Sequence, residues 1–587
     1  MKLIRIIALF SLLAIGVQAA QKPNIVVVLT DDQGWGDLSL NGNKNLSTPA
    51  IDSLAKDGAM FERFYVCPVC SPTRAEFLTG RYHVRGGVYS TSAGGERLDL
   101  DELTIGDTFK AGGYATGAFG KWHNGMQYPY HPNGRGFEEF YGFCSGHWGD
   151  YFSRPLDHNG KIVQGKGFCI DDFTDKAMDF MEASVKQDKP FFAYLPYNTP
   201  HSPMQVPDRF WEKFKDFDLK MHNRDPKRED IRHIRAALAM CENIDWNVGR
   251  ILKKLETLKV ADNTIVIYFC DNGPNGTRWN GNMKGRKGST DEGGVRSPML
   301  IRWPDRIEPG TVVNRNGAAI DLLPTLAEMA DIDVVNQHKL DGRSLRAAIL
   351  GTEKARKDTR LIFSFWKGRL SVKSGKFRMD QKGKLFDLES DPGQYKDISK
   401  KMPKLTKQLQ AAMAGFKKND AAGYDQDERP FVIGHPGYRY TQIPARDASW
   451  TGGIKRSNKF PNCSYLSNWT NVDDKIYWQA KLPANGTFDV ELQYACRKAD
   501  VGAELELSFN GTKIRRKITQ AHEVHEHGGE NDRTGYRAES YVKDWKTIKF
   551  GRLQLKKGDG ELMLRALKIP GDAAIDFRLL FFTRVGR

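Results

Sequence analysis

A cysteine at the start of a predicted helix is the first feature of this sequence that suggests chemistry. The segment from Cys70 reads CSPTRAEFLTG. Pro72 suits the first turn of a helix, Ser71 is a candidate N-cap, and Gly80 is a natural stop. The helix N-terminus would stabilise an anion there, and Arg74 adds a positive charge. The cysteine is therefore a candidate nucleophile or a candidate for modification, although a buried cysteine beside a capped helix is the simpler alternative.

Residues with oxygen ligands follow two predicted strands directly. Asp31 and Asp32 follow the apolar run at 24–29, and Asp271 and Asn272 follow the run at 264–270. Such oxygens suit a hard cation such as Ca²⁺ or Mg²⁺. No nearby set of Cys and His has the spacing of a tetrahedral zinc site. An aspartate at a strand end also commonly caps the next helix, so each pair taken alone has two explanations.

Basic residues follow two further predicted strands. Lys121 and His123 come after the run at 114–119, and His201 comes soon after the run at 191–195. Taken alone, the lysine is most often a solvated charge, and the second histidine is more often a hydrogen-bonded loop residue than a catalyst. These alternatives would all have to be true together to remove a site built from these side chains.

The strands that precede these residues alternate with predicted helices up to about residue 335. Continuous apolar, β-branched runs such as 24–29 are typical of strands covered on both faces. The pattern therefore predicts an α/β fold with a mostly parallel central sheet. In such sheets the ligand crevice lies beyond the carboxyl ends of the strands, so we expect the acids, the lysine and the histidines to meet at one edge.

Several segments together resemble the signatures of the formylglycine-dependent sulfatases. They are the Cys-x-Pro-x-Arg core at Cys70 followed by Leu-Thr-Gly-Arg, the Gly-Lys-Trp-His at 120–123, the segment 284–298 that contains Lys287, and the Leu-x-Asp-Leu-x-x-Asp-Pro at 385–392. The resemblance extends over residues 22–400, with no departure at a catalytic position. It implies an alkaline-phosphatase-like α/β sandwich and a sulfuric ester hydrolase.

The resemblance implies a modified nucleophile and a bound cation. Cys70 would be oxidised after synthesis to formylglycine by a formylglycine-generating maturation enzyme. The hydrate of this aldehyde would attack sulfur and form a covalent sulfate ester while Asp271 accepts its proton. The metal would be Ca²⁺, with Mg²⁺ as the alternative, and its ligands would be Asp31, Asp32, Asp271, Asn272 and the modified residue 70.

The resemblance also assigns the positive groups and the proton transfers. Arg74, Lys121 and Lys287 would neutralise the sulfate oxygens. His201, together with Lys287, would protonate the departing alcohol. His123 would then deprotonate the second hydroxyl of the nucleophile, which expels sulfate and restores the aldehyde.

Net charge and a targeting signal indicate the kind of partner and the location of the protein. The 587-residue chain carries a net charge of +16 from scattered basic residues, which suggests an acidic partner. Nucleic acid and a sulfated polymer both fit that charge, but no nucleic-acid-binding motif is present. Residues 1–20 read as a secretory signal, with no later run long enough to span a membrane. We therefore expect a secreted or periplasmic protein that acts on a sulfated carbohydrate.

The character of the sequence changes along the chain. We expect an α/β catalytic domain at 21–345, a small α+β subdomain at 346–420, a linker or extended segment at 421–446, and an all-β sandwich at 447–587. Alternating apolar residues from 488 to 496 and from 505 to 509 support the sandwich, as do the hairpin signals Asn510-Gly511 and Asp559-Gly560.

Aromatic and polar side chains outside the main motifs are candidate substrate contacts. Trp450, Trp469, Trp478 and Trp545 of the predicted sandwich suit stacking on sugar rings, although core packing is the commoner role of such residues. Between residues 143 and 151, the candidates are Ser145, His147 and Trp148.

Eight cysteines are present, and in an oxidising compartment some of them could pair. Cys144–Cys169 and Cys463–Cys496 are plausible pairs by proximity, but sequence does not fix the connectivity. Cys67-Pro-Val-Cys70 also matches the spacing of thiol–disulfide oxidoreductases. A disulfide there would block oxidation to the aldehyde, and the motif explains none of the acidic strand ends.

Two other functions remain open at this stage. A phosphomonoester or phosphonate-ester hydrolase could use the same scaffold, because phosphate and sulfate esters share geometry. A carbohydrate-binding protein with an inactive catalytic domain is the second alternative, although the complete set of candidate nucleophile, lysines, histidines and acids argues against it.

Overall fold

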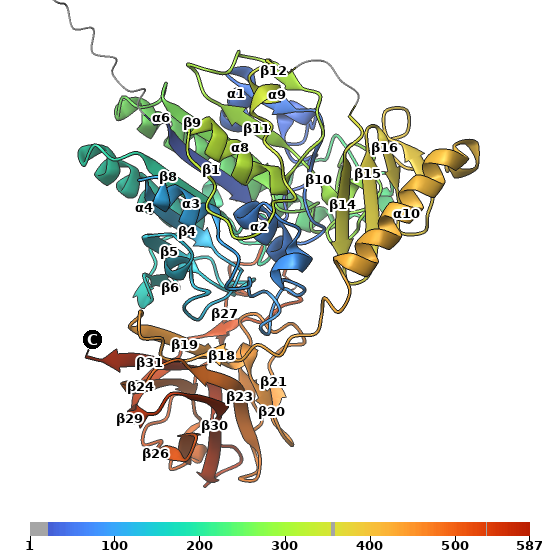
Figure 1. Cartoon of the computed structure of the whole chain (residues 1–587). Helices are drawn as coiled ribbons and strands as arrows, with labels where there is room; N and C mark the ends of the chain where they lie inside the picture. The colour runs from blue at the N-terminus through green and yellow to red at the C-terminus, as the bar shows by residue number, and fades with distance from the viewer. Residues whose placement is uncertain (1–21, 354–357, 536, 587) are drawn as a thin grey trace, which may run out of the picture.

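The computed structural model describes residues 22–353, 358–535 and 537–586, so the predicted signal segment at 1–20 lies outside the described residues. A ten-stranded sheet forms the centre of the larger part of the molecule (Figure 1). Its strands, in spatial order, are β12 (Thr311–Val313), β2 (Ala59–Phe61), β11 (Met299–Arg302), β9 (Thr264–Cys270), β1 (Asn24–Thr30), β8 (Phe191–Pro196), β4 (Ala115–Lys121), β5 (Glu139–Phe143), β6 (Pro155–His158) and β7 (Lys161–Gln164).

The middle of this sheet is parallel. β1 pairs in parallel with β8 and with β9, and β4 pairs in parallel with β8 and with β5. Antiparallel pairs lie toward the two edges, where β11 joins β9 and where β6 joins β5 and β7. The predicted α/β class with a mostly parallel central sheet is confirmed.

Strand β1 shows why its sequence is apolar throughout. Val26 and Val28 pack on one face of the sheet with helices α1, α4 and α6. Ile25 and Val27 pack on the other face with α2, α3 and α8. The helices are α1 (Pro49–Lys56), α4 (Cys169–Lys186), α6 (Ile231–Thr257), α2 (Cys70–Thr79), α3 (Ile105–Ala111) and α8 (Leu322–Met329). Because both faces are covered, successive side chains are all buried.

A four-stranded antiparallel sheet beside the main sheet carries α10 (Pro403–Asn419) across one face (Figure 1). Its strands are β14 (Leu361–Trp366), β15 (Arg369–Ser374), β16 (Phe377–Met379) and β17 (Leu385–Asp387). This segment therefore contains both strands and a helix, the α+β content expected for 346–420. Smaller elements complete this half, namely β3 (Phe64–Tyr65), β10 (Arg296–Ser297), β13 (Gly317–Ala318), α5 (Asp208–Phe214), α7 (Glu292–Val295) and α9 (Arg346–Ile349).

The C-terminal part is a sandwich of two six-stranded sheets around its own apolar core. One sheet contains β18 (Phe431–Val432), β20 (Ser449–Trp450), β23 (Lys475–Leu482), β25 (Glu504–Phe509), β26 (Thr512–Lys517) and β30 (Gly558–Lys568). The other contains β19 (Tyr440–Pro444), β21 (Lys455–Arg456), β22 (Leu466–Ser467), β24 (Gly486–Ala495), β29 (Lys546–Leu555) and β31 (Asp576–Val585). The predicted alternation is confirmed, because apolar residues of β24 and β25 face this core.

Two local expectations are wrong. The N-cap of α2 is Val69, so Cys70 is the first helical residue and Ser71 lies inside the helix. Asp559 and Gly560 are not a hairpin turn, because they lie inside β30 and pair with β23. The other hairpin signal is confirmed, since Asn510 and Gly511 connect β25 to β26, both with positive φ.

Part of the segment expected as a linker or extended chain belongs to the sandwich sheets. β18 pairs with β23, and β19 pairs with β31 along its whole length. None of the helices in the described part of the chain is long and apolar enough to cross a bilayer.

None of the suggested disulfides is formed, because all eight cysteines are free thiols and all are buried. Cys169 donates a hydrogen bond to the side-chain oxygen of Asn198 at 3.4 Å. Cys463 donates to the carbonyl oxygen of His147 at 2.8 Å. These sulfur atoms are therefore directed at polar partners rather than at the cysteines nearest in sequence.

Candidate active site

The carboxyl ends of neighbouring strands bring the predicted acids together. β9, β1, β8 and β4 are adjacent in the sheet, so the loops that follow them share one edge. Asp31 and Asp32 follow β1, while Asp271 and Asn272 follow β9. Lys121 is the last residue of β4. The convergence expected from the strand ends is therefore present.

Cys70 joins this cluster from the N-terminus of α2. The cysteine Sγ and one carboxylate oxygen each of Asp31 and Asp271 all lie within 4.8 Å of one another. The same helix carries Arg74, which is fully buried. A helix N-terminus and a buried guanidinium therefore face the same point as the two carboxylates.

The carboxyl groups of Asp31 and Asp271 differ in the direction in which their pKa is shifted. Lys121 Nζ donates a short hydrogen bond to Asp31, and Arg74 Nη2 lies 2.9 Å from Asp271 Oδ2 and 3.7 Å from Asp31 Oδ2. Burial raises the pKa of Asp31, but the charges of Lys121, His201 and Arg74 outweigh it and hold that pKa well below its usual range. Burial and the neighbouring Asp31 charge raise the pKa of Asp271.

Asp32 is the second acid of the β1 end. Lys287 Nζ lies 2.8 Å from its carboxylate, and Asn272 Nδ2 donates a hydrogen bond to it at 2.8 Å. His201 Nε2 lies 3.7 Å from its Oδ2 atom. Asp32 has a φ of 64°, in the left-handed region, where an aspartate is tolerated better than most side chains. The lysine of the second sulfatase-like segment thus reaches the same cluster.

The oxygens of this cluster fit a hard cation. Asp31 Oδ1 and Asn272 Oδ1 are buried and have no hydrogen-bond partner among the described residues. A buried polar atom without a partner is costly, and a divalent cation would satisfy both atoms at once. Carboxylate and amide oxygens are the ligands that Ca²⁺ and Mg²⁺ prefer. Asp31, Asp32, Asp271 and Asn272 could therefore hold such an ion.

Cys70 is poorly suited to act as a thiolate. Burial raises the pKa of its thiol to about 11, despite the nearby charges of Lys121 and Lys287. The thiolate, not the thiol, is the nucleophilic form of cysteine. An unmodified Cys70 would therefore be mainly in the protonated, weakly nucleophilic form at neutral pH.

Each of the two candidate histidines has one ring nitrogen close to a backbone carbonyl oxygen. His123 Nε2 lies 2.9 Å from the carbonyl oxygen of Thr91, so it donates its proton there, and the buried Nδ1 has no partner among the described residues. His201 Nδ1 lies 2.6 Å from the carbonyl oxygen of Ser202. Burial lowers the pKa of both rings. Each ring therefore offers one nitrogen for proton transfer.

The structure places one further acid, Glu539, beside the candidate histidines, which the sequence did not indicate. Glu539, from the loop that joins the sandwich strands β27 (Glu526–His527) and β28 (Val542–Lys543), lies 3.0 Å from His147 Nδ1. Burial raises the pKa of Glu539, but His147 and His201 hold it well below its usual range. No local motif marks this glutamate, which lies 338 residues after His201. Only the folded arrangement of the two parts reveals it.

The other candidate substrate contacts divide between core and surface. Trp469 and Trp478 are 1 % exposed in the sandwich core, and Trp450 packs against its edge. Trp148 stacks on Phe143 with ring centroids 5.1 Å apart. Trp148 and Trp545 both line a cavity of about 340 Å³ between the sandwich and the catalytic part. Of the four sandwich tryptophans considered, Trp545 is thus the one that lines this cavity.

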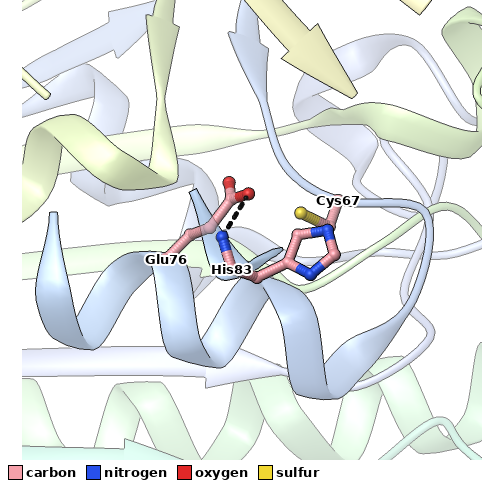
Figure 2. A group of neighbouring side chains, drawn as sticks. All are labelled: Cys67, Glu76 and His83. Atoms are coloured by element: carbon pink, nitrogen blue, oxygen red, sulfur yellow. Dashed lines mark hydrogen bonds between the residues drawn. The ribbon is translucent and has the colours of Figure 1, made fainter. Parts of the chain in front are cut away.

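A second buried cluster lies behind the helix that carries Cys70. Figure 2 shows Cys67, Glu76 and His83, with a hydrogen bond of 3.3 Å from the backbone N of His83 to Glu76 Oε1. Both ring nitrogens of His83 lie near backbone carbonyl oxygens, at 2.6 and 3.2 Å. Burial raises the pKa of Glu76 to about 8 and lowers that of His83 to about 4. Cys67 belongs to this cluster, whereas Cys70 belongs to the acid cluster, so the Cys-x-x-Cys spacing does not form a redox pair.

Cations and carboxylates buried beyond the carboxyl ends of a parallel sheet are typical of enzymes that hydrolyse anionic esters. The sulfatase family model matches residues 23–332 of this chain. A model of the N-sulphoglucosamine sulphohydrolase C-terminal region matches residues 287–419. The chain therefore belongs to the sulfatase family and is a sulfuric ester hydrolase.

Known relatives cover a large part of the chain. It is 31% identical to the N-acetylgalactosamine-6-sulfatase of Mus musculus over 383 residues, which are 60% of this chain and 70% of that protein. It is 32% identical to the arylsulfatase A of Homo sapiens over 409 residues, which are 62% of this chain and 76% of that protein. The crystal structure of Ps i-CgsB in complex with k-i-k-neocarrahexaose matches with a TM-score of 0.63 and 30% identity, covering 68% of this chain and 94% of that chain.

Proposed function

We propose that this sulfatase hydrolyses sulfate monoesters on sulfated carbohydrates, with formylglycine formed at residue 70 as the nucleophile. The observation that carries the proposal is the meeting of Cys70, Asp31 and Asp271 within 4.8 Å. Arg74, Lys121 and Lys287 surround this point with positive charge. A dianionic transition state with charge spread over sulfate oxygens needs such an arrangement.

The residues of the chain have distinct roles in this proposal. Asp271, whose pKa is raised by burial and by Asp31, accepts the proton of the attacking hydroxyl of the hydrated residue 70. Lys121, Lys287 and Arg74 bind the sulfate oxygens and neutralise the charge that develops on them. These cations also orient the ester, so that the leaving oxygen faces away from residue 70.

Two histidines complete the proton transfers. His201 in its imidazolium form keeps its Nδ1 proton on the carbonyl oxygen of Ser202 and gives its Nε2 proton to the departing alcohol oxygen, with Lys287 beside it; Nε2 faces Asp32 at 3.7 Å. His123 Nδ1, the nitrogen without a partner among the described residues, then takes a proton from the remaining hydroxyl of residue 70. Loss of that proton breaks the bond to the sulfate and restores the aldehyde.

A calcium ion is the proposed cofactor. The ion would be held by oxygen atoms, which are the ligands that Ca²⁺ prefers. Two of them, Asp31 Oδ1 and Asn272 Oδ1, have no other partner among the described residues. The full set of ligands would be Asp31, Asp32, Asp271, Asn272 and the modified residue 70. When bound, Ca²⁺ supplies positive charge that polarises the sulfate group and favours the ionised nucleophile. Mg²⁺ is the alternative, since both ions accept these ligands.

Two observations support a carbohydrate substrate. The solved structure of Ps i-CgsB, 30% identical to this chain, contains an oligosaccharide named k-i-k-neocarrahexaose. The net charge of +16 favours an anionic polymer. We also propose that the chain is exported to the periplasm or secreted, that a formylglycine-generating enzyme matures it, and that its parts divide near residues 345, 420 and 446.

The test compares sulfate and phosphate esters on one protein. Purified enzyme is incubated with defined sulfated oligosaccharides and with paired aryl sulfate and aryl phosphate, and the released anions are measured by ion chromatography. We expect sulfate release from the oligosaccharides, and loss of that activity in Cys70→Ala. Faster release of phosphate, or full activity in Cys70→Ala, would contradict the proposal.

A further inference from the structure

The loop between β27 and β28 of the sandwich lies against the active-site half of the molecule. Figure 1 places β27 at the junction of the two parts. The backbone N of Arg533 donates to the carbonyl oxygen of Met204 at 2.9 Å. Gln205 Nε2 donates to the carbonyl oxygen of Gly528 at 2.8 Å. Two hydrogen bonds thus join the loop to the segment that follows His201.

Glu539 of this loop contacts Ser202 and His147, which both lie next to His201. Its Oε2 atom accepts a hydrogen bond from Ser202 Oγ at 2.7 Å. The same atom lies 3.0 Å from His147 Nδ1, and the His147 side chain is fully buried. The Glu539 side chain is only 18 % exposed. A carboxylate with two short contacts in a largely buried environment holds both partners firmly.

Ser202 connects Glu539 to His201. The carbonyl oxygen of Ser202 lies 2.6 Å from His201 Nδ1 and accepts a second hydrogen bond, at 2.8 Å, from Tyr151 Oη. His147 Nδ1 also lies 3.1 Å from this oxygen. Glu539 thus fixes the side chain of Ser202, while the backbone of Ser202 fixes the imidazole. The opposite ring nitrogen of His201 is thereby aimed at Asp32.

A second sandwich residue reaches the other histidine. Asn462 Nδ2 donates to the carbonyl oxygen of Thr91 at 3.1 Å, and His123 Nε2 lies 2.9 Å from the same oxygen. Asn462 Oδ1 accepts hydrogen bonds from Ser145 Oγ at 3.1 Å and from the backbone N of Gly146 at 3.3 Å. Both histidines therefore have supports that come from the sandwich.

His147, His201 and Glu539 could instead form a metal site, because their donor atoms lie within 4.8 Å of one another. However, both Nδ1 atoms and the glutamate already have hydrogen-bond partners. Hydrogen bonding alone accounts for the arrangement, so we assign a positioning role.

We propose that Glu539 is a positioning residue of the active site, which orients His201 through Ser202 and His147 and makes the β-sandwich part of the catalytic unit. The family models end at residue 419, so this role lies outside the part of the chain that they match. The inference rests on the proposed function only in its use of His201 as the proton donor.

Graded leaving groups test this role directly. A misplaced proton donor harms a poor leaving group more than a good one. We therefore expect Glu539→Gln to lower kcat by about 30-fold on the least activated aryl sulfate and by about 3-fold on the most activated one. Simple aryl sulfates carry no sugar, so glycan binding by the sandwich does not enter this comparison.

Two further variants make the result decisive. Ser202→Ala removes the hydroxyl that Glu539 holds, so it should reproduce the same graded loss, and the double variant should add little to either change. If Glu539→Gln does not fold, Ser202→Ala carries the test. Glu530→Gln makes the same change on the same loop at a side chain that is 57 % exposed, and it should retain wild-type rates.

The contrary result is a loss of equal size on every ester together with a lower melting temperature, which would make Glu539 only a docking contact. Unchanged rates in both Glu539→Gln and Ser202→Ala would also overturn the proposal. Failure of the proposed function is distinguishable, because then the wild-type protein itself would release no sulfate.

Discussion

At the scale of residues, the acid cluster carries its own counter-charges. Asp31 and Asp32 each have an ion-paired lysine, Lys121 and Lys287 respectively. Yet Asp31 Oδ1 and Asn272 Oδ1 remain without partners among the described residues. The lysines offset part of the cost of burying carboxylates, while the two unpartnered oxygens are left for a ligand.

Metal removal should therefore abolish activity. We expect sulfate release to fall to background after treatment with EGTA and to return on addition of Ca²⁺, with less recovery on Mg²⁺. Calcium should also raise the melting temperature of the chelated protein, because a ligand that binds only the folded state stabilises it. In Asp31→Asn, the calcium concentration needed for this shift should rise. Full activity in protein shown by elemental analysis to hold no divalent cation would contradict the assignment.

The sequence alone predicted that these side chains would lie close together. The four acid and amide positions followed from strand ends, because parallel strands must place their carboxyl ends at one edge. Lys121, His123 and His201 also followed from strand ends, whereas Lys287 was found only through the motifs that resemble the sulfatases. Glu539 and Asn462 were missed, since their contacts depend on how the sandwich docks, and no periodicity or spacing encodes that arrangement.

At the scale of elements, α2 is placed by what lies behind it as well as by its own sequence. Its whole length is buried, and its Glu76 accepts a hydrogen bond from the backbone N of His83 (Figure 2). Gly80 ends the helix with a φ of 68°, a conformation that favours glycine. Cys70 is therefore presented to the site by a helix that has little freedom to move.

The buried glutamate should make stability fall as pH rises. Its pKa moves from 4.5 to about 8 on folding, so the folded state binds the extra proton between these values. The stabilisation is fully present below pH 4.5 and is lost as pH rises through about 8, with a slope of up to about 1.4 kcal/mol per pH unit.

The measurement is the melting temperature as a function of pH. Glu76→Gln should give a flatter profile than wild type and a higher melting temperature at pH 9. Glu138→Gln, at a side chain that is 42 % exposed, should keep the wild-type profile. An equally steep fall in Glu76→Gln would show that another group titrates.

The elements themselves were partly predictable. The strands and helices of the α/β part followed from apolar runs and their breaks, and Asn510-Gly511 marked a true hairpin. Asp559-Gly560 misled, because the chain between β29 and β30 crosses from one sheet of the sandwich to the other. Ser71 misled because Cys70 itself already has helical conformation, so the N-cap is Val69, two residues before the predicted one.

At the scale of the whole molecule, buried charge joins the sandwich to the catalytic part. Arg446 Nη2 lies 2.9 Å from Glu96 Oε1, and both side chains are almost fully buried. The same arginine donates to Asn462 Oδ1 at 2.6 Å, which in turn supports the loop around Ser145. The expected linker at 421–446 thus ends in a residue that fixes the relative position of the two parts.

Removing that arginine should loosen the junction. Arg446→Ala leaves Glu96 as an uncompensated buried charge, which typically costs about 3–5 kcal/mol. We expect a matching drop in the free energy of unfolding by chemical denaturation, together with lower activity. Arg552→Ala breaks an exposed pair with Asp489 and should leave the stability nearly unchanged. A single transition at the wild-type midpoint in Arg446→Ala would contradict this role.

The most direct test of the central claim is mass spectrometry of the peptide that contains residue 70, taken from enzyme of known specific activity. We predict an aldehyde at this position and a rate of sulfate release that increases in proportion to the fraction converted. Fully active enzyme in which residue 70 is an unmodified cysteine would contradict the account.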